Sequence, residues 1–281
     1  MKRVSILDLK AKKERGEKIV ALTAYDFPTA RILDESGVDL ILVGDSAANV
    51  VLGYESTLPV TLDEMIVLTG AVARGVKHAL VVADLPFMSY QVSEDQALES
   101  AGRFVKEAGA GAIKLEGGHR SVPAIRRIVD AGIPVMGHLG LTPQSHLAFG
   151  GHRVQGREDG QARMLIEEAR ELEAAGVFSM VLEGIPWTLA REISDALEVP
   201  TIGIGAGVEC DGQILVLHDM LGLGGGDFKF VKRYADLDGE IGRAVSDYAR
   251  EVREGIFPAE KHRFEPGTRR SRANTGGDRK V

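Results

Sequence analysis

The chain has 281 residues, of which 44% are hydrophobic and 27% charged, a composition typical of one large or two small globular domains. Its formal net charge of −7 and its aromatic content of 5% argue against a nucleic-acid-binding surface. Cys210 is the only cysteine, so no intrachain disulfide can form, and neither a signal peptide nor a membrane-spanning stretch is evident. We therefore expect a cytoplasmic, enzyme-sized protein without membrane or nucleic-acid partners.

The first predicted element is a helix that Ser5 can cap and that continues to about Glu14. Because it is rich in Lys and Glu, we expect it to lie outside the main fold. Eight apolar runs follow, and each is typical of a strand that is covered on both faces. They lie at about residues 18–24, 39–43, 79–83, 111–115, 133–137, 177–182, 199–203 and 214–218.

Amphipathic segments separate most of these runs, and a glycine directly follows four of them. The helices are predicted over residues 27–36, 62–74, 94–108 and 161–175, and the glycines are Gly37, Gly75, Gly109 and Gly176. A glycine in this place adopts the left-handed conformation that satisfies the last carbonyl groups of a helix. Each of the four is therefore predicted to end its helix.

Strands that alternate with helices indicate right-handed crossovers and a parallel sheet. Eight such units predict a single (β/α)8 TIM barrel over residues 1–265, including the N-terminal helix. An open doubly wound sheet is the alternative, but it usually has a glycine-rich turn after its first strand, where this chain has Thr23-Ala24-Tyr25-Asp26. Residues 266–281 are rich in Arg, Ser, Thr and Gly without apolar periodicity, which predicts a disordered tail.

Five of the apolar runs stop on a side chain that can carry chemistry. These side chains are Asp45, Asp84, Glu116, His138 and Glu183. Parallel strands all end at the same edge of a sheet or barrel, so the sequence predicts that the five gather at one mouth. A mouth with four carboxylates and an imidazole is typical of an active site.

Asp45, Asp84 and Glu116 end the second, third and fourth predicted strands. Neighbouring strands lie roughly 5 Å apart, so the three carboxylates can reach one ion. Oxygen-only ligands favour a hard cation, Mg²⁺ above all. The alternative is that each acid caps the loop or helix that follows it, which is less favoured for three acids on adjacent strands than for one.

Lys114 lies two residues before Glu116, so both side chains point to the same side of their strand. A lysine inside an apolar strand is costly unless it is paired. It can bind a substrate carboxylate or enolate oxygen, or it can form a buried ion pair with one of the acids. The two roles are compatible.

Glu183 ends the sixth predicted strand, across the mouth from the three acids, and is therefore free for proton transfer. Alternatively it caps the helix that begins near Pro186. His138 ends the fifth strand, between Glu183 and the acids. It can hydrogen-bond a substrate oxygen or shuttle a proton, or it can be a loop residue without such a role.

At these residues the chain resembles the ketopantoate hydroxymethyltransferase (3-methyl-2-oxobutanoate hydroxymethyltransferase) family. That family belongs to the phosphoenolpyruvate mutase/isocitrate lyase-like barrel superfamily. The resemblance covers about residues 3–264. Its main motifs are Leu42-Val43-Gly44-Asp45-Ser46, Ala83-Asp84-Leu85-Pro86-Phe87-Met88, Ile113-Lys114-Leu115-Glu116-Gly117-Gly118, Gly137-His138-Leu139-Gly140-Leu141-Thr142-Pro143-Gln144 and Leu182-Glu183.

The resemblance implies transfer of a one-carbon unit from 5,10-methylenetetrahydrofolate to 3-methyl-2-oxobutanoate. The product would be 2-dehydropantoate, in pantothenate and hence coenzyme A biosynthesis, through an enolate that Mg²⁺ stabilises. The resemblance also implies a cytosolic homo-oligomer, commonly a decamer. Its implied residue roles are Mg²⁺ binding by Asp45, Asp84 and Glu116, contact with the 2-oxo acid by Asp45, Ser46, Asp84 and Lys114, and proton acceptance by Glu183.

Two other functions are compatible with such a barrel. A Mg²⁺-dependent carbon–carbon lyase would share the metal and the enolate chemistry, but such lyases typically carry a reactive cysteine after an early strand. The only cysteine here is Cys210, far along the chain. A catalytically dead scaffold would be expected to lack one or more of the site acids, and all of them are present.

Overall fold

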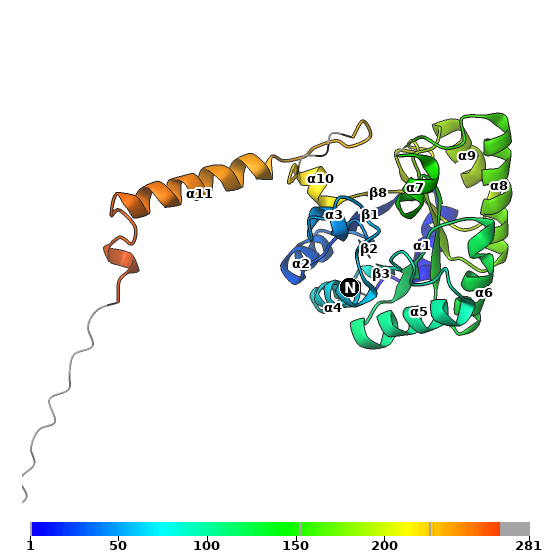
Figure 1. Ribbon diagram of the computed structural model, residues 1–281, viewed down its shortest axis with the longest axis horizontal. Helices are drawn as coiled ribbons and strands as arrows, with labels where there is room; N and C mark the ends of the chain where they lie inside the picture. Colours follow the sequence, from blue (N-terminus) through cyan, green and yellow to red (C-terminus); the bar gives the residue numbers. More distant parts are fainter. Residues whose placement is uncertain (1, 152, 225, 227, 265–281) are drawn as a thin grey trace, which may run out of the picture. The chain divides into compact units, whose positions relative to one another are not determined.

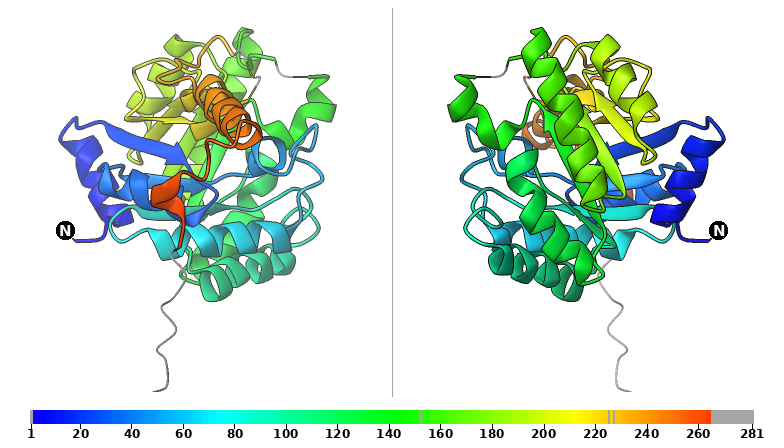
Figure 2. Two further views of the ribbon diagram at one scale, coloured as in Figure 1. Left: turned by 90° about the vertical axis from the view of Figure 1, so that its left-hand side faces the viewer. Right: turned by 90° about the vertical axis from the view of Figure 1, so that its right-hand side faces the viewer.

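The computed structural model describes residues 2–151, 153–224, 226 and 228–264 (Figure 1, Figure 2). Contacts between residues divide the chain into two compact units, Met1–Ala235 and Asp236–Val281. The tail predicted over residues 266–281 lies outside the described residues. The predicted domain boundary at residue 265 also lies there and stays a prediction.

The first unit contains a closed barrel of eight parallel strands, in which each strand pairs with the next and β8 pairs with β1. The (β/α)8 prediction is therefore confirmed, and the open doubly wound sheet is excluded. The strands, labelled in part in Figure 1, are β1 (Ile19–Thr23), β2 (Leu40–Val43), β3 (Leu80–Asp84), β4 (Ala112–Lys114), β5 (Val135–Gly140), β6 (Ser179–Glu183), β7 (Thr201–Ile204) and β8 (Gly212–Leu215).

The eighth strand begins earlier than its predicted run at residues 214–218. It starts at Gly212, and Leu217 instead begins the short helix α10 (Leu217–Leu221). A Cβ atom at Gly212 would lie 2.6 Å from the carbonyl oxygen of Ile19, so only glycine fits where β8 closes the barrel against β1. The apolar run does not mark the start of this strand, because β8 begins on glycine and an exposed glutamine.

Each of the first six strands is followed by a helix that returns the chain to the next strand. These helices are α2 (Phe27–Glu35), α4 (Leu62–Gly75), α5 (Glu94–Ala108), α6 (Val122–Asp130), α8 (Asp159–Ala174) and α9 (Trp187–Ala196). Shorter helices lie in the loops that follow β2, β4 and β5. They are α3 (Ala47–Val50), η1 (His119–Ser121), η2 (Pro143–Ser145) and α7 (His146–Phe149).

The glycine prediction is confirmed at Gly109, which ends α5 with a φ of 75° and donates its N–H to the carbonyl of Phe104. It is wrong at Gly75, which is the last residue of α4 and has no positive φ. A Cβ atom at Gly75 would lie 2.7 Å from the carbonyl oxygen of Phe27, at the start of α2. This glycine is therefore needed for the close approach of two helices rather than for a turn.

Two apolar clusters form the core. The larger cluster lies between the barrel and its helices, and the smaller one lines the inside of the barrel with side chains from all eight strands. Leu9 of α1 (Ile6–Glu14) belongs to the inner cluster and is fully buried. The expectation that α1 lies outside the main fold is therefore wrong: it closes the end of the barrel where the strands begin.

The second unit contains α11 (Leu237–Arg253), whose N-terminus is capped by Asp236, and the turn η3 (Glu260–His262). None of the residues of α11 is buried, and its apolar side chains repeat at helical spacing from Ile241 through Val245 to Val252. In the part of the chain that the structure describes, no helix has both the length and the apolar character needed to cross a membrane.

Candidate active site

The candidate site is the last layer of side chains inside the barrel. On β3, Leu80 and Val82 belong to the inner apolar cluster, and Asp84 is the next residue that points the same way. The same step of two residues leads from Ala112 to Lys114, from Met136 to His138 and from Val181 to Glu183. The strand period that builds the core therefore also turns these polar side chains to the inside of the barrel, where the strands end.

Lys114 forms a buried ion pair with Asp84. Its Nζ atom lies 2.7 Å from both carboxylate oxygens of Asp84 and 3.8 Å from Oε1 of Glu116. Burial opposes the charged form of Lys114, but the carboxylates of Asp84 and Glu116 outweigh this effect and raise the pKa of the lysine. The structure thus shows the predicted ion pair between Lys114 and Asp84.

Gln144 is a site residue that the sequence did not predict. Its Nε2 atom donates hydrogen bonds to Oδ2 of Asp45 (2.9 Å) and to the carbonyl of Leu85 (2.9 Å). Its backbone N–H donates to Oε2 of Glu116 (3.0 Å). The hydroxyl of Tyr90 donates to Oε1 of Gln144 (2.9 Å), which fixes the orientation of the amide. Gln144 therefore connects two of the predicted metal ligands, and its position at the end of the Gly137–Gln144 motif was the available signal.

His138 lies between Glu116 and Glu183, as predicted from the strand order. Its Nδ1 atom is 3.4 Å from Oε1 of Glu116, and its Nε2 atom is 3.3 Å from Oε2 of Glu183. Neither ring nitrogen has a hydrogen bond of good geometry, although the ring is buried. Glu183 does not cap α9, which begins after Pro186 without a side-chain cap.

Ser46 follows Asp45 and starts α3 without capping that helix. Its hydroxyl lies 2.8 Å from the hydroxyl of Tyr25, whose side chain is buried. Tyr25 is a second residue near the site that the sequence did not predict. It belongs to the loop after β1, so the sequence gives no direct sign that its ring reaches the loop after β2.

Asp45, Asp84, Glu116 and Lys114 form an acid cluster, and its electrostatics favour an added cation. Burial, followed by repulsion from Asp84 and Glu116, raises the pKa of Asp45 well above its usual range. Burial and Lys114 oppose the charged form of His138, but contacts with Glu116 and Glu183 raise the pKa of its imidazole to about 9. Burial also opposes ionisation of Glu116, but the contact with His138 outweighs it and lowers the pKa of that carboxyl.

The donor set fits Mg²⁺. The backbone N–H of Asp45 donates to Oδ2 of Asp84 (3.2 Å), and Oε1 of Glu116 is buried without a hydrogen-bond partner. Among residues 2–151, 153–224, 226 and 228–264, no group of three or more His, Cys, Asp or Glu side chains is arranged to hold a metal ion. Mg²⁺ usually takes only one or two protein carboxylates and fills its shell with water and substrate oxygens. The three metal ligands therefore stay a prediction.

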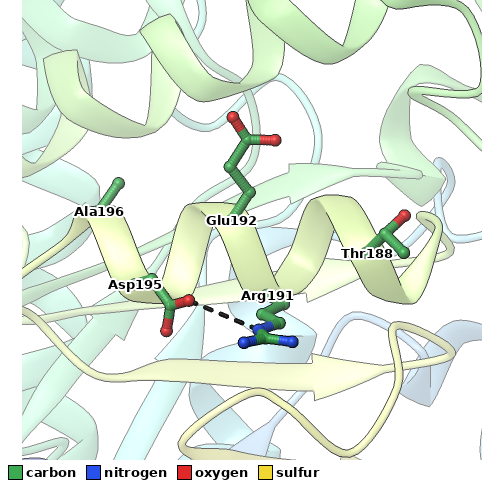
Figure 3. Close-up of a pocket in the computed structure, with 5 residues that line it drawn as sticks. All are labelled: Thr188, Arg191, Glu192, Asp195 and Ala196. Atoms are coloured by element: carbon green, nitrogen blue, oxygen red, sulfur yellow. Dashed lines mark ion pairs between the residues drawn. The ribbon is translucent and has the colours of Figure 1, made fainter.

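A hollow with a volume of about 410 Å³ lies on the flank of α9 (Figure 3). Figure 3 shows that its lining residues come from that helix alone. Its charged pair, Arg191 and Asp195, lies 3.6 Å apart and is exposed to solvent. No strand end contributes to this hollow, so it is not part of the candidate site.

Comparison with known proteins identifies the family. A family model described as ketopantoate hydroxymethyltransferase matches residues 3–260. The chain belongs to this family. Within the ketopantoate hydroxymethyltransferase family, the 3-methyl-2-oxobutanoate hydroxymethyltransferase of Thermobifida fusca (strain YX) is 58% identical over 263 residues, 94% of each chain. The enzyme of the same name from Syntrophotalea carbinolica is 54% identical over 264 residues, which cover 94% of this chain and 99% of that one.

Solved structures of other enzymes share the barrel of this ketopantoate hydroxymethyltransferase family member at low sequence identity. A 2,3-dimethylmalate lyase of the PEP mutase/isocitrate lyase superfamily aligns with a TM-score of 0.59 at 15% identity, covering 92% of this chain and 91% of that one. A phosphonopyruvate hydrolase in complex with oxalate and Mg²⁺ aligns with a TM-score of 0.60 at 13% identity, covering 93% of each. At these identities the likeness shows the shared fold.

Proposed function

We propose that this protein transfers the one-carbon unit of 5,10-methylenetetrahydrofolate to 3-methyl-2-oxobutanoate and forms 2-dehydropantoate, a step of pantothenate biosynthesis. The observation that carries the proposal is the arrangement of Glu183, which lies beside the imidazole of His138 on the side opposite Glu116 of the acid cluster. The acid cluster would therefore serve as the binding group, and Glu183, on the other side of the His138 imidazole, would be a separate carboxylate base. Membership of the family makes this pair of substrates the first to test.

The acid cluster would bind the metal and the 2-oxo acid. Asp45, Asp84 and Glu116 would hold Mg²⁺, which when bound would polarise the keto group and make the neighbouring C3 proton easier to remove. Lys114 would place its ammonium beside the negative charge that develops on the substrate oxygen. The hydroxyl of Ser46 would donate a hydrogen bond to the substrate carboxylate. Gln144 would keep Asp45 and Glu116 oriented.

Glu183 would accept the C3 proton. The imidazole of His138 would hold the carboxylate of Glu183 through Nε2 and would hydrogen-bond a substrate oxygen when it rotates away from Glu116. C3 would then form a carbon–carbon bond with the methylene carbon of the donor. Both carbon–nitrogen bonds of that methylene would break, the nitrogens of tetrahydrofolate would take protons, and water would supply the hydroxyl oxygen.

The fold-level neighbours support the metal part of this proposal. Oxalate, which is bound together with Mg²⁺ in the phosphonopyruvate hydrolase structure, presents a pair of adjacent oxygens as a 2-oxo acid does. This support is by analogy, because one barrel fold hosts many reactions. A cytoplasmic location and a homo-oligomer, with a decamer as the form that the resemblance implies, are part of the same proposal.

Cys210 argues against the lyase alternative. It is fully buried and lies two residues before β8, at the end of the barrel where the strands begin. Burial raises the pKa of its thiol. A buried thiol at the opposite end of the barrel does not serve chemistry at the mouth.

The test is exchange of the C3 proton. Enzyme, Mg²⁺ and 3-methyl-2-oxobutanoate are mixed in heavy water, and deuteration at C3 is followed by NMR. We expect exchange that requires Mg²⁺, and 2-dehydropantoate once 5,10-methylenetetrahydrofolate is added. Absence of both metal-dependent exchange and product would overturn the proposal.

A further inference from the structure

A cavity of about 430 Å³ opens beside the acid cluster, between the loops that follow β3, β4 and β5. Glu116 of the acid cluster and its hydrogen-bond partner Gln144 also line this cavity. The rest of its wall extends outward to Phe87, Glu94 and Arg120. The cavity therefore adjoins the place where the 2-oxo acid would react and continues away from it.

We infer that this cavity binds the second substrate, a reduced pterin that carries an arylamide and an anionic tail. The inference rests on the proposed function. The 2-oxo acid is small and would be held within the acid cluster, so it does not need the adjoining space. A cavity of several hundred Å³ is in the usual range for a larger ligand with aromatic rings.

The contact with Glu116 and Gln144 suits the reacting end of such a ligand. The methylene carbon of the donor is bonded to one ring nitrogen and to the arylamine nitrogen, so it lies in the middle of the molecule. It must come within about 3–3.5 Å of C3 of the 2-oxo acid for a bond to form. A donor in this cavity would bring that carbon to the Glu116 side of the cluster and extend its two ends outward.

The ring of Phe87 is placed to stack on the flat part of the donor. It is 37% exposed and lines the cavity. Its loop is held in place: Met88 has a positive φ of 65°, and its carbonyl accepts a hydrogen bond from Nε2 of Gln96 (2.9 Å). The next carbonyl, of Ser89, accepts from the hydroxyl of Ser100 (2.7 Å). An exposed aromatic ring on a fixed loop is a feature of a built binding site.

Arg120 supplies a charge for the anionic tail. Within the described part of the chain it has no ion pair, whereas Arg127 on the next helix pairs with Asp95. The helix α6, which begins just after Arg120, has no acidic residue in its first turn. The hydroxyl of Ser121 donates to the carbonyl of Glu116 instead of capping α6. A cation and the start of a helix that no side chain caps thus meet at one side of the cavity, which favours a carboxylate there.

Glu94 gives the cavity an acidic group as well as a basic one. The edge of a 2-amino-4-oxo pterin carries adjacent N–H donors, which a carboxylate can accept. A free phosphate or a simple anion would not need this acid, nor an aromatic ring. The combination therefore favours the folate donor over an anion as the ligand.

The experiment measures binding of tetrahydrofolate by fluorescence titration and the KM for 5,10-methylenetetrahydrofolate. We expect Arg120→Ala to raise both the Kd and the KM at least tenfold, and Phe87→Ala to raise them severalfold. Tetrahydropteroate, which lacks the glutamate tail, should bind the wild type and Arg120→Ala with similar affinity. Arg126→Ala, an exposed arginine of α6 outside the cavity, is the matched control and should change neither value.

Wild-type Kd values for tetrahydrofolate in both Arg120→Ala and Phe87→Ala would overturn the inference. So would an equal loss of tetrahydropteroate binding in Arg120→Ala. Exchange at C3 needs no donor, so the wild-type exchange rate in the same preparation decides separately on the proposed function. The titration with tetrahydrofolate tests ligand binding in the cavity independently of the outcome of the exchange test.

Discussion

The two ends of the barrel bury carboxylates in opposite ways. Where the strands begin, each acid has its own partner: the buried Asp39 pairs with Lys12 (2.6 Å), and the half-buried Asp211 with Lys13 (2.9 Å). Asp34 accepts hydrogen bonds from three successive backbone N–H groups, those of residues 77–79. These acids hold α1, α2 and the strand starts together.

Where the strands end, Asp84 and Glu116 share one lysine, Lys114, and the imidazole of His138 is held between two carboxylates without good hydrogen bonds. Such an arrangement stores unfavourable charge that a cation and a bound substrate can relieve. The difference between the two ends teaches that burial of a charged group does not by itself mark function. Several buried charged groups that lie in one place with incomplete pairing are, by contrast, typical of a functional site.

The largest expected effects fall at the strand-exit end. We expect Asp84→Asn to abolish Mg²⁺-dependent turnover, because the change removes a predicted metal ligand and leaves Lys114 without its ion-pair partner. Steady-state assays over a range of Mg²⁺ concentrations measure this. If Asp84→Asn turns over at the wild-type rate in excess Mg²⁺, Asp84 is only the ion-pair partner of Lys114.

Removal of the proposed base should lower the rate by about 10²–10⁴-fold, the usual contribution of a general base. Glu183→Gln keeps the shape of the side chain and removes its ability to take a proton. C3 exchange in heavy water is the readout, and the melting temperature is the control. A mutant that exchanges at the wild-type rate would show that another group takes the proton.

A smaller effect is expected from Gln144→Leu, which removes the amide that binds Asp45, although the backbone N–H to Glu116 remains. Partners that orient metal ligands typically contribute about 10–100-fold to affinity or activity. The apparent Mg²⁺ affinity and the C3 exchange rate should fall together in this range. An unchanged Mg²⁺ affinity would mean that Gln144 acts only in packing.

At the opposite end, Asp34→Asn should lower stability without changing the rate of C3 exchange. Burial alone would raise the pKa of Asp34, but its three backbone N–H donors outweigh burial and lower that pKa. The stabilisation is therefore present above the unfolded pKa of about 3.9 and is lost as the pH falls through the lower, folded value. Loss of about 1–3 kcal/mol is expected at pH 7.

Chemical denaturation at pH 7 and below pH 4 measures the loss in Asp34→Asn. The difference in unfolding free energy between wild type and mutant should shrink towards the acidic end. A difference that stays constant with pH would contradict a stabilising role for the ionised carboxylate.

The strand ends and the fold could be predicted because they depend on local sequence. A continuous apolar run that ends on Asp84 or Glu183 predicts a strand and the residue at its end. The closed barrel then brings the strand ends together. What could not be predicted depends on contacts between distant loops. Gln144 reaches Asp45 across 99 residues of chain, and its place at the end of the Gly137–Gln144 motif does not indicate which residue it contacts.

The docking of α1 was missed for a related reason. Its single buried leucine, Leu9, stands among lysines, and such a pattern is typical of a helix in solvent. In the structure the lysines Lys12 and Lys13 are instead paired with acids at the strand starts. One buried residue in a helix produces no apolar periodicity, so the docking of α1 through Leu9 is visible only in the structure.

The separation between the acid cluster and the proposed base, Glu183, is best tested by one titration. 3-Methyl-2-oxobutanoate is titrated into Glu183→Gln in the presence and absence of Mg²⁺ by calorimetry, and C3 exchange is measured on the same samples. We expect Mg²⁺-dependent binding within a few-fold of the wild type together with loss of exchange. Loss of Mg²⁺-dependent binding, or exchange at the wild-type rate, would contradict a base that is separate from the metal and substrate site.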